Sequence, residues 1–152
     1  MNIAALLLIA LQLGTNEACD LAKRQVLPIL RDLLQTSRTA AKETERALFL
    51  TQDDDGEIDY ELWPATMQRR KASYRGVRPL NTVAIAHTHP HNMPNPSTHD
   101  IEEAARIGLP IYVVTRMAIF RVDPDRTTSE VVRHVDWAAE LQRGKDPCEQ
   151  WS

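Results

Sequence analysis

The fold is decided by Val83-Ala84-Ile85-Ala86-His87-Thr88-His89, which runs through a proline-rich segment to Ser97-Thr98-His99-Asp100. The first four residues form a compact apolar run typical of a buried strand, and this run leads straight into His87. Residues 90–96 hold three prolines and two asparagines and therefore predict a loop. Apolar residues at 101, 104, 105 and 107 then mark one face of a helix that Gly108 and Pro110 end. The stretch predicts a strand–loop–helix unit.

Further strands are expected on both sides of this unit. Residues 111–115 read Ile-Tyr-Val-Val-Thr, a buried strand, and residues 118–122 form another after a tight turn. Upstream, the apolar run 47–50 is followed by Asp53-Asp54-Asp55-Gly56 and then by alternating apolar residues over 58–62. An apolar run, an Asp-Gly pair and an alternating run together predict a hairpin.

The aspartates of this turn also raise the question of a calcium loop. With Gly56 at position 6 of an EF-hand loop, position 1 is Thr51 and position 12 is Leu62. Neither residue supplies the required acidic ligand, so we interpret the cluster as a solvated turn. The polar, basic segment 63–80 that follows the hairpin is interpreted as a surface loop or as a flap over a cleft.

Helices are expected at both ends of the domain. Apolar residues recur at helical spacing over 17–37, where Pro28 costs a hydrogen bond and predicts a kink. The apolar residues of 131–141 suggest a final helix capped by Thr127, Thr128 or Ser129. Helix, hairpin, strand, helix, hairpin and helix in this order predict a mixed α/β sandwich around a single central mixed sheet.

Composition places the chain among ordinary soluble domains. Its 152 residues correspond to about one domain, with 43% apolar and 26% charged residues. A formal net charge of −3 excludes nucleic-acid binding driven by overall positive charge. Cys19 and Cys148 are too few for a disulfide framework or a four-cysteine zinc site.

The N-terminus permits two interpretations. Residues 3–13 form an apolar run about as long as the core of a signal peptide, but no Lys or Arg precedes it and no good cleavage site follows. Residues 1–18 are therefore either a signal or membrane tether, or the buried start of the first helix, and both a cytoplasmic and an exported protein stay open. Residues 146–152 are expected to form a tail. Cys19 and Cys148 could pair only in an exported protein.

Two histidines and an aspartate carry the most specific chemistry. His87 and His89 stand two apart on a strand, so both rings leave the same face of the sheet. Asp100, at the start of the following helix, could swing in as a third ligand. Two histidines and one carboxylate leave one tetrahedral position open for water, which is the pattern of catalytic zinc. Ser97 and Asp100 also resemble a capping box, and the serine can cap the helix while presenting its hydroxyl to the metal.

The spacing His87-x-His89-x7-Ser97-x2-Asp100 resembles the JAMM signature of the Jab/MPN metallopeptidases, without a gap. The resemblance extends over residues 20 to about 125 through the order of elements. It implies an MPN-type, cytidine-deaminase-like sandwich over 19–145, one Zn²⁺ per chain on His87, His89 and Asp100, and hydrolysis of a peptide or isopeptide bond. Ser97 would then help to hold the oxyanion or to orient the water.

The family also uses an upstream glutamate, and the chemistry requires a group that takes the proton of the activated water. Glu43 and Glu45 both qualify and share one parity in a strand. We choose Glu45 because it leads directly into the strand at 47–50 and its spacing to Gly56 resembles that of the family. Three positions after it, Leu48 stands where the family usually has a small residue.

The remaining histidines and the tryptophans receive structural interpretations. His99 is expected to point away, His91 lies in the proline-rich loop near substrate, and His134 has a surface role. The expected partner is a peptide or protein substrate, with a ubiquitin-like protein among the substrates that the resemblance allows, and no nucleic acid. Two rival functions are a non-catalytic MPN-like binding scaffold and another metal-dependent hydrolase. The tryptophans are interpreted as packing residues: Trp63, Trp137 and Trp151.

Overall fold

The computed structural model describes residues 15–38, 44–64, 74–89, 93–133 and 136–145. The helices are α2 (Thr15–Arg38), α3 (Thr98–Ile107) and α4 (Trp137–Gln142). The strands are β1 (Ala47–Gln52), β2 (Ile58–Leu62), β3 (Thr82–Thr88), β4 (Ile111–Val114), β5 (Ala118–Val122) and β6 (Thr128–Arg133).

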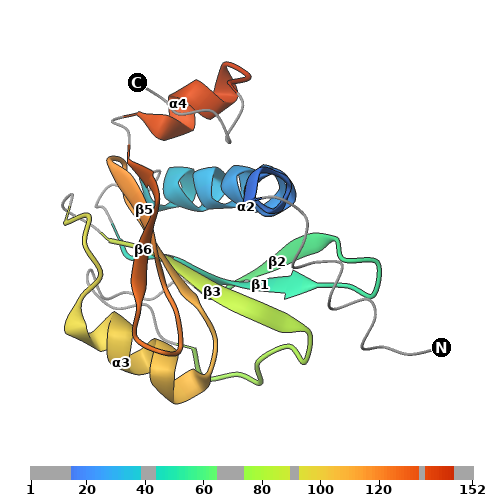
Figure 1. The fold of residues 1–152 in the computed structure, drawn as a ribbon. Coiled ribbons are helices and arrows are strands. Elements are labelled where there is room, and N and C mark those ends of the chain that lie inside the picture. Colours follow the sequence, from blue (N-terminus) through green and yellow to red (C-terminus); the bar gives the residue numbers. More distant parts are fainter. Residues whose placement is uncertain (1–14, 39–43, 65–73, 90–92, 134–135, 146–152) are drawn as a thin grey trace.

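These strands form one mixed sheet in the order β2-β1-β3-β4-β5-β6 (Figure 1). Neighbouring strands are antiparallel except β3 and β4, which run parallel. A parallel pair needs a crossover connection, and α3 supplies it between β3 and β4. The predicted mixed α/β architecture around a single central sheet is therefore confirmed, with β3 near its middle.

Helices cover the two faces of the sheet: α2 lies on one side and α3 on the other (Figure 1). Strand alternation sorts the side chains between them. Leu48, Leu50 and Ala86 join the core cluster with α2, whereas Phe49 and Ile85 join the core cluster with α3. Phe49 of β1 and Ile85 of β3 thus face α3, and this face carries the candidate site.

The hairpin of β1 and β2 has the predicted turn chemistry. Leu50 pairs with Tyr60, and Gly56 has the positive φ of 87° that the turn requires. An oxygen of the Asp53 side chain accepts hydrogen bonds from the backbone N–H groups of Asp55 and Glu57. The aspartate cluster therefore organises a tight turn, in agreement with its interpretation as a solvated turn.

The first helix is slightly longer than the expected span of 17–37 and continues through Pro28. The side chains of Leu27, Leu30 and Leu33 are almost fully buried against the sheet, as their helical spacing predicts. Within the described residues, no helix has the length and apolar character needed to cross a membrane. The apolar run over 3–13 lies outside the described residues.

The predicted final helix over 131–141 is wrong in its first half. Residues 128–133 form β6, which pairs antiparallel with β5, and Val132 stands opposite Ile119. Val131 and Val132 are β-branched residues that fit a pleated strand, and the backbone partners on β5 outweigh the apparent helical spacing. The helical spacing over 131–141 combines two valines of strand β6 with two alanines of α4, which belong to separate elements.

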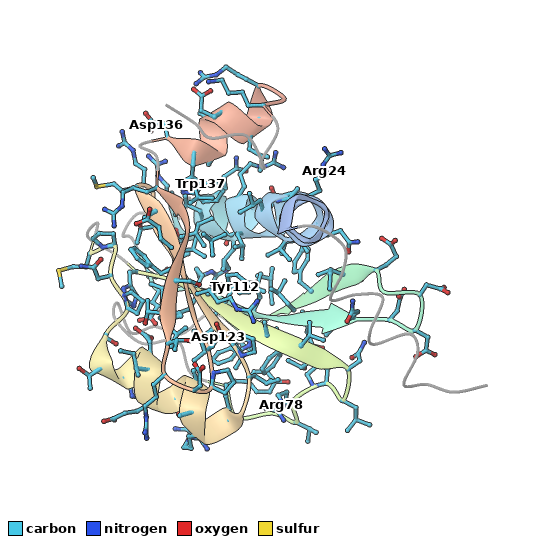
Figure 2. All side chains as sticks on the ribbon, viewed as in Figure 1. Arg24, Arg78, Tyr112, Asp123, Asp136 and Trp137 are labelled. Atoms are coloured by element: carbon cyan, nitrogen blue, oxygen red, sulfur yellow. The ribbon has the colours of Figure 1, made fainter. Side chains whose placement is uncertain are left out.

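The predicted caps of that helix are wrong for the same reason. Thr127 lies in the β5–β6 turn, where its backbone N–H and hydroxyl donate to the Asp125 side chain. Thr128 and Ser129 belong to β6. The short α4 begins after Asp136, and its first residue, Trp137, is fully buried (Figure 2).

Candidate metal centre

His87 and His89 come from the end of β3 that points toward the start of α3. His87 pairs with Ala47 of β1 and shares the face of Ile85, so its ring lies on the α3 side of the sheet. His89 follows the last strand residue, and its backbone N–H still donates to the Val114 carbonyl of β4 at 3.1 Å. The two rings are in edge contact, with centroids 4.9 Å apart. The same-face prediction for the histidine pair is confirmed.

Asp100 is positioned by the first turn of α3. Ser97 is the N-cap of this helix, and its hydroxyl oxygen accepts a hydrogen bond from the Asp100 backbone N–H. The Asp100 carboxylate returns the contact by accepting from the Ser97 backbone N–H at 2.6 Å, which completes the predicted capping box. The Ser97 hydroxyl also donates to the same carboxylate oxygen at 2.7 Å. These bonds hold a buried carboxylate in one orientation.

The three side chains converge on one small volume. Oδ1 of Asp100 lies 2.8 Å from Nε2 of His87, and Oδ2 lies 3.4 Å from Nε2 of His89. One ligand atom from each residue lies within 4.8 Å of the other two. Nitrogen and carboxylate ligands at such distances suit a divalent transition metal such as zinc.

The outer nitrogens of both rings are already held by acceptors. Nδ1 of His87 lies 2.9 Å from Oε1 of Glu45, and Nδ1 of His89 lies 3.2 Å from the Met93 carbonyl oxygen. An acceptor on Nδ1 places the hydrogen there, which leaves the Nε2 lone pair free for a metal. Outer partners of this kind are typical of metal-binding histidines.

Nε2 of His87 is the atom that tests the fit to a metal. It is buried and, among the described residues, has no hydrogen-bond partner, although Asp100 Oδ1 lies only 2.8 Å away. The geometry is therefore close in distance but poorly directed for a hydrogen bond. A buried nitrogen without a bond beside a carboxylate fits a shared metal ligand set, so the residues present are compatible with zinc.

The protonation states of His87 and Asp100 depend strongly on each other. Burial by itself lowers the pKa of His87, but its contacts with Asp100 and Glu45 outweigh burial and raise this pKa to about 9. Burial likewise favours the neutral form of Asp100, whereas contacts with His87, His89 and Ser97 hold its pKa well below the usual range. Without a metal, a proton on His87 balances the negative charge of the Asp100 and Glu45 carboxylates. A bound cation would take the place of this proton.

Glu45 lies directly beside the cluster, just before β1. The β1–β3 register places Ala47 opposite His87, so Glu45 continues the same face toward His89. Glu43 lies outside the described residues. Leu48 is fully buried in the core cluster with α2, on the opposite face, and so the departure from the family pattern at this position leaves the cluster unobstructed.

A cavity of about 240 Å³ opens beside the candidate ligands. Trp63, interpreted from the sequence as a packing residue, contacts Phe49 and Tyr74 and also lines this cavity. The backbone N–H of Trp63 donates to the Ala47 carbonyl, so Trp63 lies beside Ala47 in the hairpin. The hairpin register and the alternation of side chains along a strand together therefore predict Trp63 on the cavity face. The lining residues are Glu45, Ala47, Trp63, Tyr74, Ile85, His87, His99, Asp100, Glu103 and Ile111.

The remaining sequence candidates are distributed as follows. His99 is exposed, as expected for a residue that points away from the ligands, but it reaches the rim of the cavity. Trp137 is a packing residue, because its ring is fully buried and its Nε1 donates to the Thr115 carbonyl at 2.7 Å. The predictions for His91, His134 and Trp151, and half of the proposed flap (65–73 of 63–80), fall outside the described residues.

Comparisons with known proteins bear on the family. No curated protein sequence matches the chain. A solution structure of a protein from Salinibacter ruber (strain DSM 13855) is similar, with a TM-score of 0.42 and 19% sequence identity over 70% of this chain and 87% of that chain. The model of the family described as prokaryotic homologs of the JAB domain matches residues 12–134. This match spans most of the chain, which therefore belongs to the prokaryotic JAB-domain homologues.

Proposed function

We propose that the chain is a zinc-dependent peptidase or isopeptidase. The observation that carries the proposal is the convergence of His87, His89 and Asp100, with one ligand atom of each within 4.8 Å of the others. Membership in the JAB family supports it, because that family includes hydrolases. Two histidines and one carboxylate leave one tetrahedral position for water or substrate, as catalytic zinc sites require.

Bound zinc would lower the pKa of a water molecule and polarise the scissile carbonyl. Within this chain, His87 and His89 would present their Nε2 atoms to the ion, and Asp100 would present its carboxylate. The partners on both Nδ1 atoms and the capping box on Asp100 hold these ligands before any metal arrives. Such preorganisation favours a defined geometry at the reacting atoms.

Glu45 is the proposed general base. Its carboxylate lines the cavity next to the ligands and contacts His87 through Oε1. From this position it would accept the proton of the attacking water and return it to the leaving amine. The contact with His87 gives Glu45 a second task, since the carboxylate also orients the imidazole.

Ser97 is the proposed oxyanion donor. In the present conformation its hydroxyl hydrogen points to Asp100 Oδ2, so the hydroxyl both caps α3 and orients the carboxylate. Rotation about its Cβ–Oγ bond would turn the hydrogen toward a developing oxyanion and leave the oxygen in its capping position. Such a donor acts on charge that exists only during the reaction.

The proposed substrate is a peptide or isopeptide bond in an extended segment. The cavity is open to one side and sits on a sheet face, where an extended chain can reach the ligands. Nucleic acid is not among the proposed partners, given the net negative charge.

The direct test is cleavage of quenched fluorescent peptides and of isopeptide-linked substrates by the zinc-loaded chain. We expect turnover that a chelator abolishes and added zinc restores. His99→Ala is a matched control for zinc binding, since His99 neighbours Asp100 in sequence but is exposed and outside the proposed ligand set. Stoichiometric zinc without turnover of any substrate would favour the scaffold function instead.

A further inference from the structure

The cavity beside the candidate ligands has two chemically different halves. Glu45, His87, His99, Asp100 and Glu103 form the polar half. The other half is an apolar wall, called here the aromatic wall, and it has no charged group. It consists of Ala47, Trp63, Tyr74, Ile85 and Ile111.

The aromatic wall is a packed structure. The Phe49 ring lies behind it, 5.1 Å from the Trp63 ring and 4.8 Å from the Tyr74 ring, and the Trp63 and Tyr74 rings are 5.4 Å apart. These spacings are those of favourable aromatic pairs. Ile85 and Ile111 come from paired positions of β3 and β4. The wall is therefore supported by the sheet itself.

Size and charge limit what can occupy this space. A volume of about 240 Å³ lies below the range of about 300–1,000 Å³ typical of pockets for whole small ligands, so it suits one side chain of a larger substrate. The acid at the rim, Glu103, is engaged by Arg106 at 2.7 Å. A charged side chain packed against the wall itself would lose hydration, because none of the five wall residues offers a charged partner.

We propose that the aromatic wall forms a specificity subsite that receives a large apolar side chain of the residue next to the scissile bond. This inference rests on the proposed function for the position of the bond. Because the cavity is continuous with the candidate ligands, a side chain held against Trp63 and Tyr74 places its own backbone carbonyl beside them. Selection among substrates then depends on burial of apolar surface at this wall.

Two substitutions of Trp63 distinguish the contribution of its ring surface from the contribution of its indole N–H. Among the described residues, the buried Nε1 of Trp63 has no hydrogen-bond partner, so Trp63→Phe removes no bond that the structure records. This variant keeps an aromatic surface, whereas Trp63→Ala removes it. Tyr60→Ala is the matched control, because Tyr60 is an exposed aromatic residue of β2 that does not line the cavity.

The test measures fluorescence anisotropy of labelled Gly-Gly-X-Gly-Gly peptides, with X as Phe, Leu, Met, Ala, Asp or Lys. The protein is the zinc-loaded Glu45→Gln chain, in which binding is observed without turnover. We expect peptides with Phe, Leu or Met to bind about tenfold or more tightly than those with Ala, Asp or Lys. Trp63→Ala in this background should abolish the preference, and Trp63→Phe and Tyr60→Ala should keep it.

Equal affinity for all six peptides, or an unchanged preference in Trp63→Ala, would overturn the subsite. If Trp63→Ala does not fold, Tyr74→Ala removes the other ring of the wall and is expected to give the same loss of preference. Cleavage by the wild-type chain is assayed in parallel. Selective binding without any cleavage would support the subsite and contradict the peptidase, whereas cleavage without selectivity would contradict the subsite alone.

Discussion

At the scale of single residues, the candidate role of Glu45 rests on the sequence and the structure together. The sequence left two glutamates of equal parity, and the structure places Glu45 2.9 Å from a ring nitrogen of His87. Its assignment as general base stays a prediction, because contact with a ligand does not establish proton transfer. Its two proposed tasks affect different measurements, so substitution can separate them.

Glu45→Gln should keep zinc and lose turnover. The amide cannot accept a proton, and loss of a general base costs about 10²–10⁴-fold in rate. The amide oxygen can still accept from Nδ1 of His87, so zinc affinity should change much less than the rate. Steady-state kinetics and zinc titration of the same preparation check this. An active Glu45→Gln chain alongside an inactive Glu43→Gln chain would move the base to Glu43.

Ser97 has a capping role that the structure confirms and a catalytic role that stays a prediction. Ser97→Ala should lose about 0.5–2 kcal/mol of unfolding free energy, whereas Ser97→Gly should lose only a few tenths, because glycine is tolerated at an N-cap. Both variants lack the hydroxyl, and both should lower kcat by roughly 10²–10³-fold if it serves the oxyanion. Urea unfolding and kcat are measured on each. Near-normal kcat in Ser97→Gly would reduce Ser97 to a cap.

At the scale of elements, the sequence predicted those whose signals are local. The Asp-Gly turn, the apolar runs of β3 and β4, and the Gly108 end of α3 all carry their chemistry in adjacent residues; Gly108 has the expected positive φ of 69°. The capping box was also visible, because three residues separate Ser97 from Asp100. Strand parity placed both histidines on one face before the partner strands were known.

The end of the chain was mispredicted because its structure depends on a distant partner. The β-branching of Val131 and Val132 favours a strand, but their spacing to the later apolar residues also fits an amphipathic helix, and pairing with β5 decides the outcome. A shift in register between Ile119 and Phe120 accommodates the consecutive valines. The sequence predicts only a packing role for Trp63, because its place in the cavity depends on the register of the hairpin.

Trp137 provides a test of the α4 packing. Trp137→Ala removes a fully buried ring and its bond to the Thr115 carbonyl, and should cost about 3–5 kcal/mol of unfolding free energy. Trp137→Phe should cost about 1–3 kcal/mol, mainly because the carbonyl is left unpaired. Urea unfolding with a common slope measures both. Since Trp137 packs in the core cluster with α2, zinc affinity of the folded Phe variant should equal that of the wild type.

At the scale of the whole molecule, the candidate centre joins elements that the chain brings together only on folding. His87 and His89 extend from β3, Asp100 begins α3, and Glu45 precedes β1. A ligand that binds the folded state alone stabilises it by mass action. Bound zinc should therefore stabilise the entire domain and not merely its own site.

Removing zinc should lower the melting temperature of the whole domain in one transition. With free zinc at about 100 times its Kd, the stabilisation is about 2.7 kcal/mol. Thermal unfolding is recorded with a chelator and with excess zinc, and the Asp100→Ala chain is the control that should respond weakly. The same zinc response in Asp100→Ala as in the wild type would place the stabilising ion elsewhere.

The central claim is that His87, His89 and Asp100 hold one zinc ion, and zinc stoichiometry tests it most directly. Wild-type chain, His99→Ala and the double variant His87→Ala/His89→Ala are dialysed against zinc, separated from free ion, and analysed for zinc and protein, with circular dichroism to confirm folding. The account predicts about one zinc per chain for the wild type and His99→Ala, and almost none for the double variant, because removal of two ligands leaves only the carboxylate. One zinc per chain in the folded double variant would contradict it.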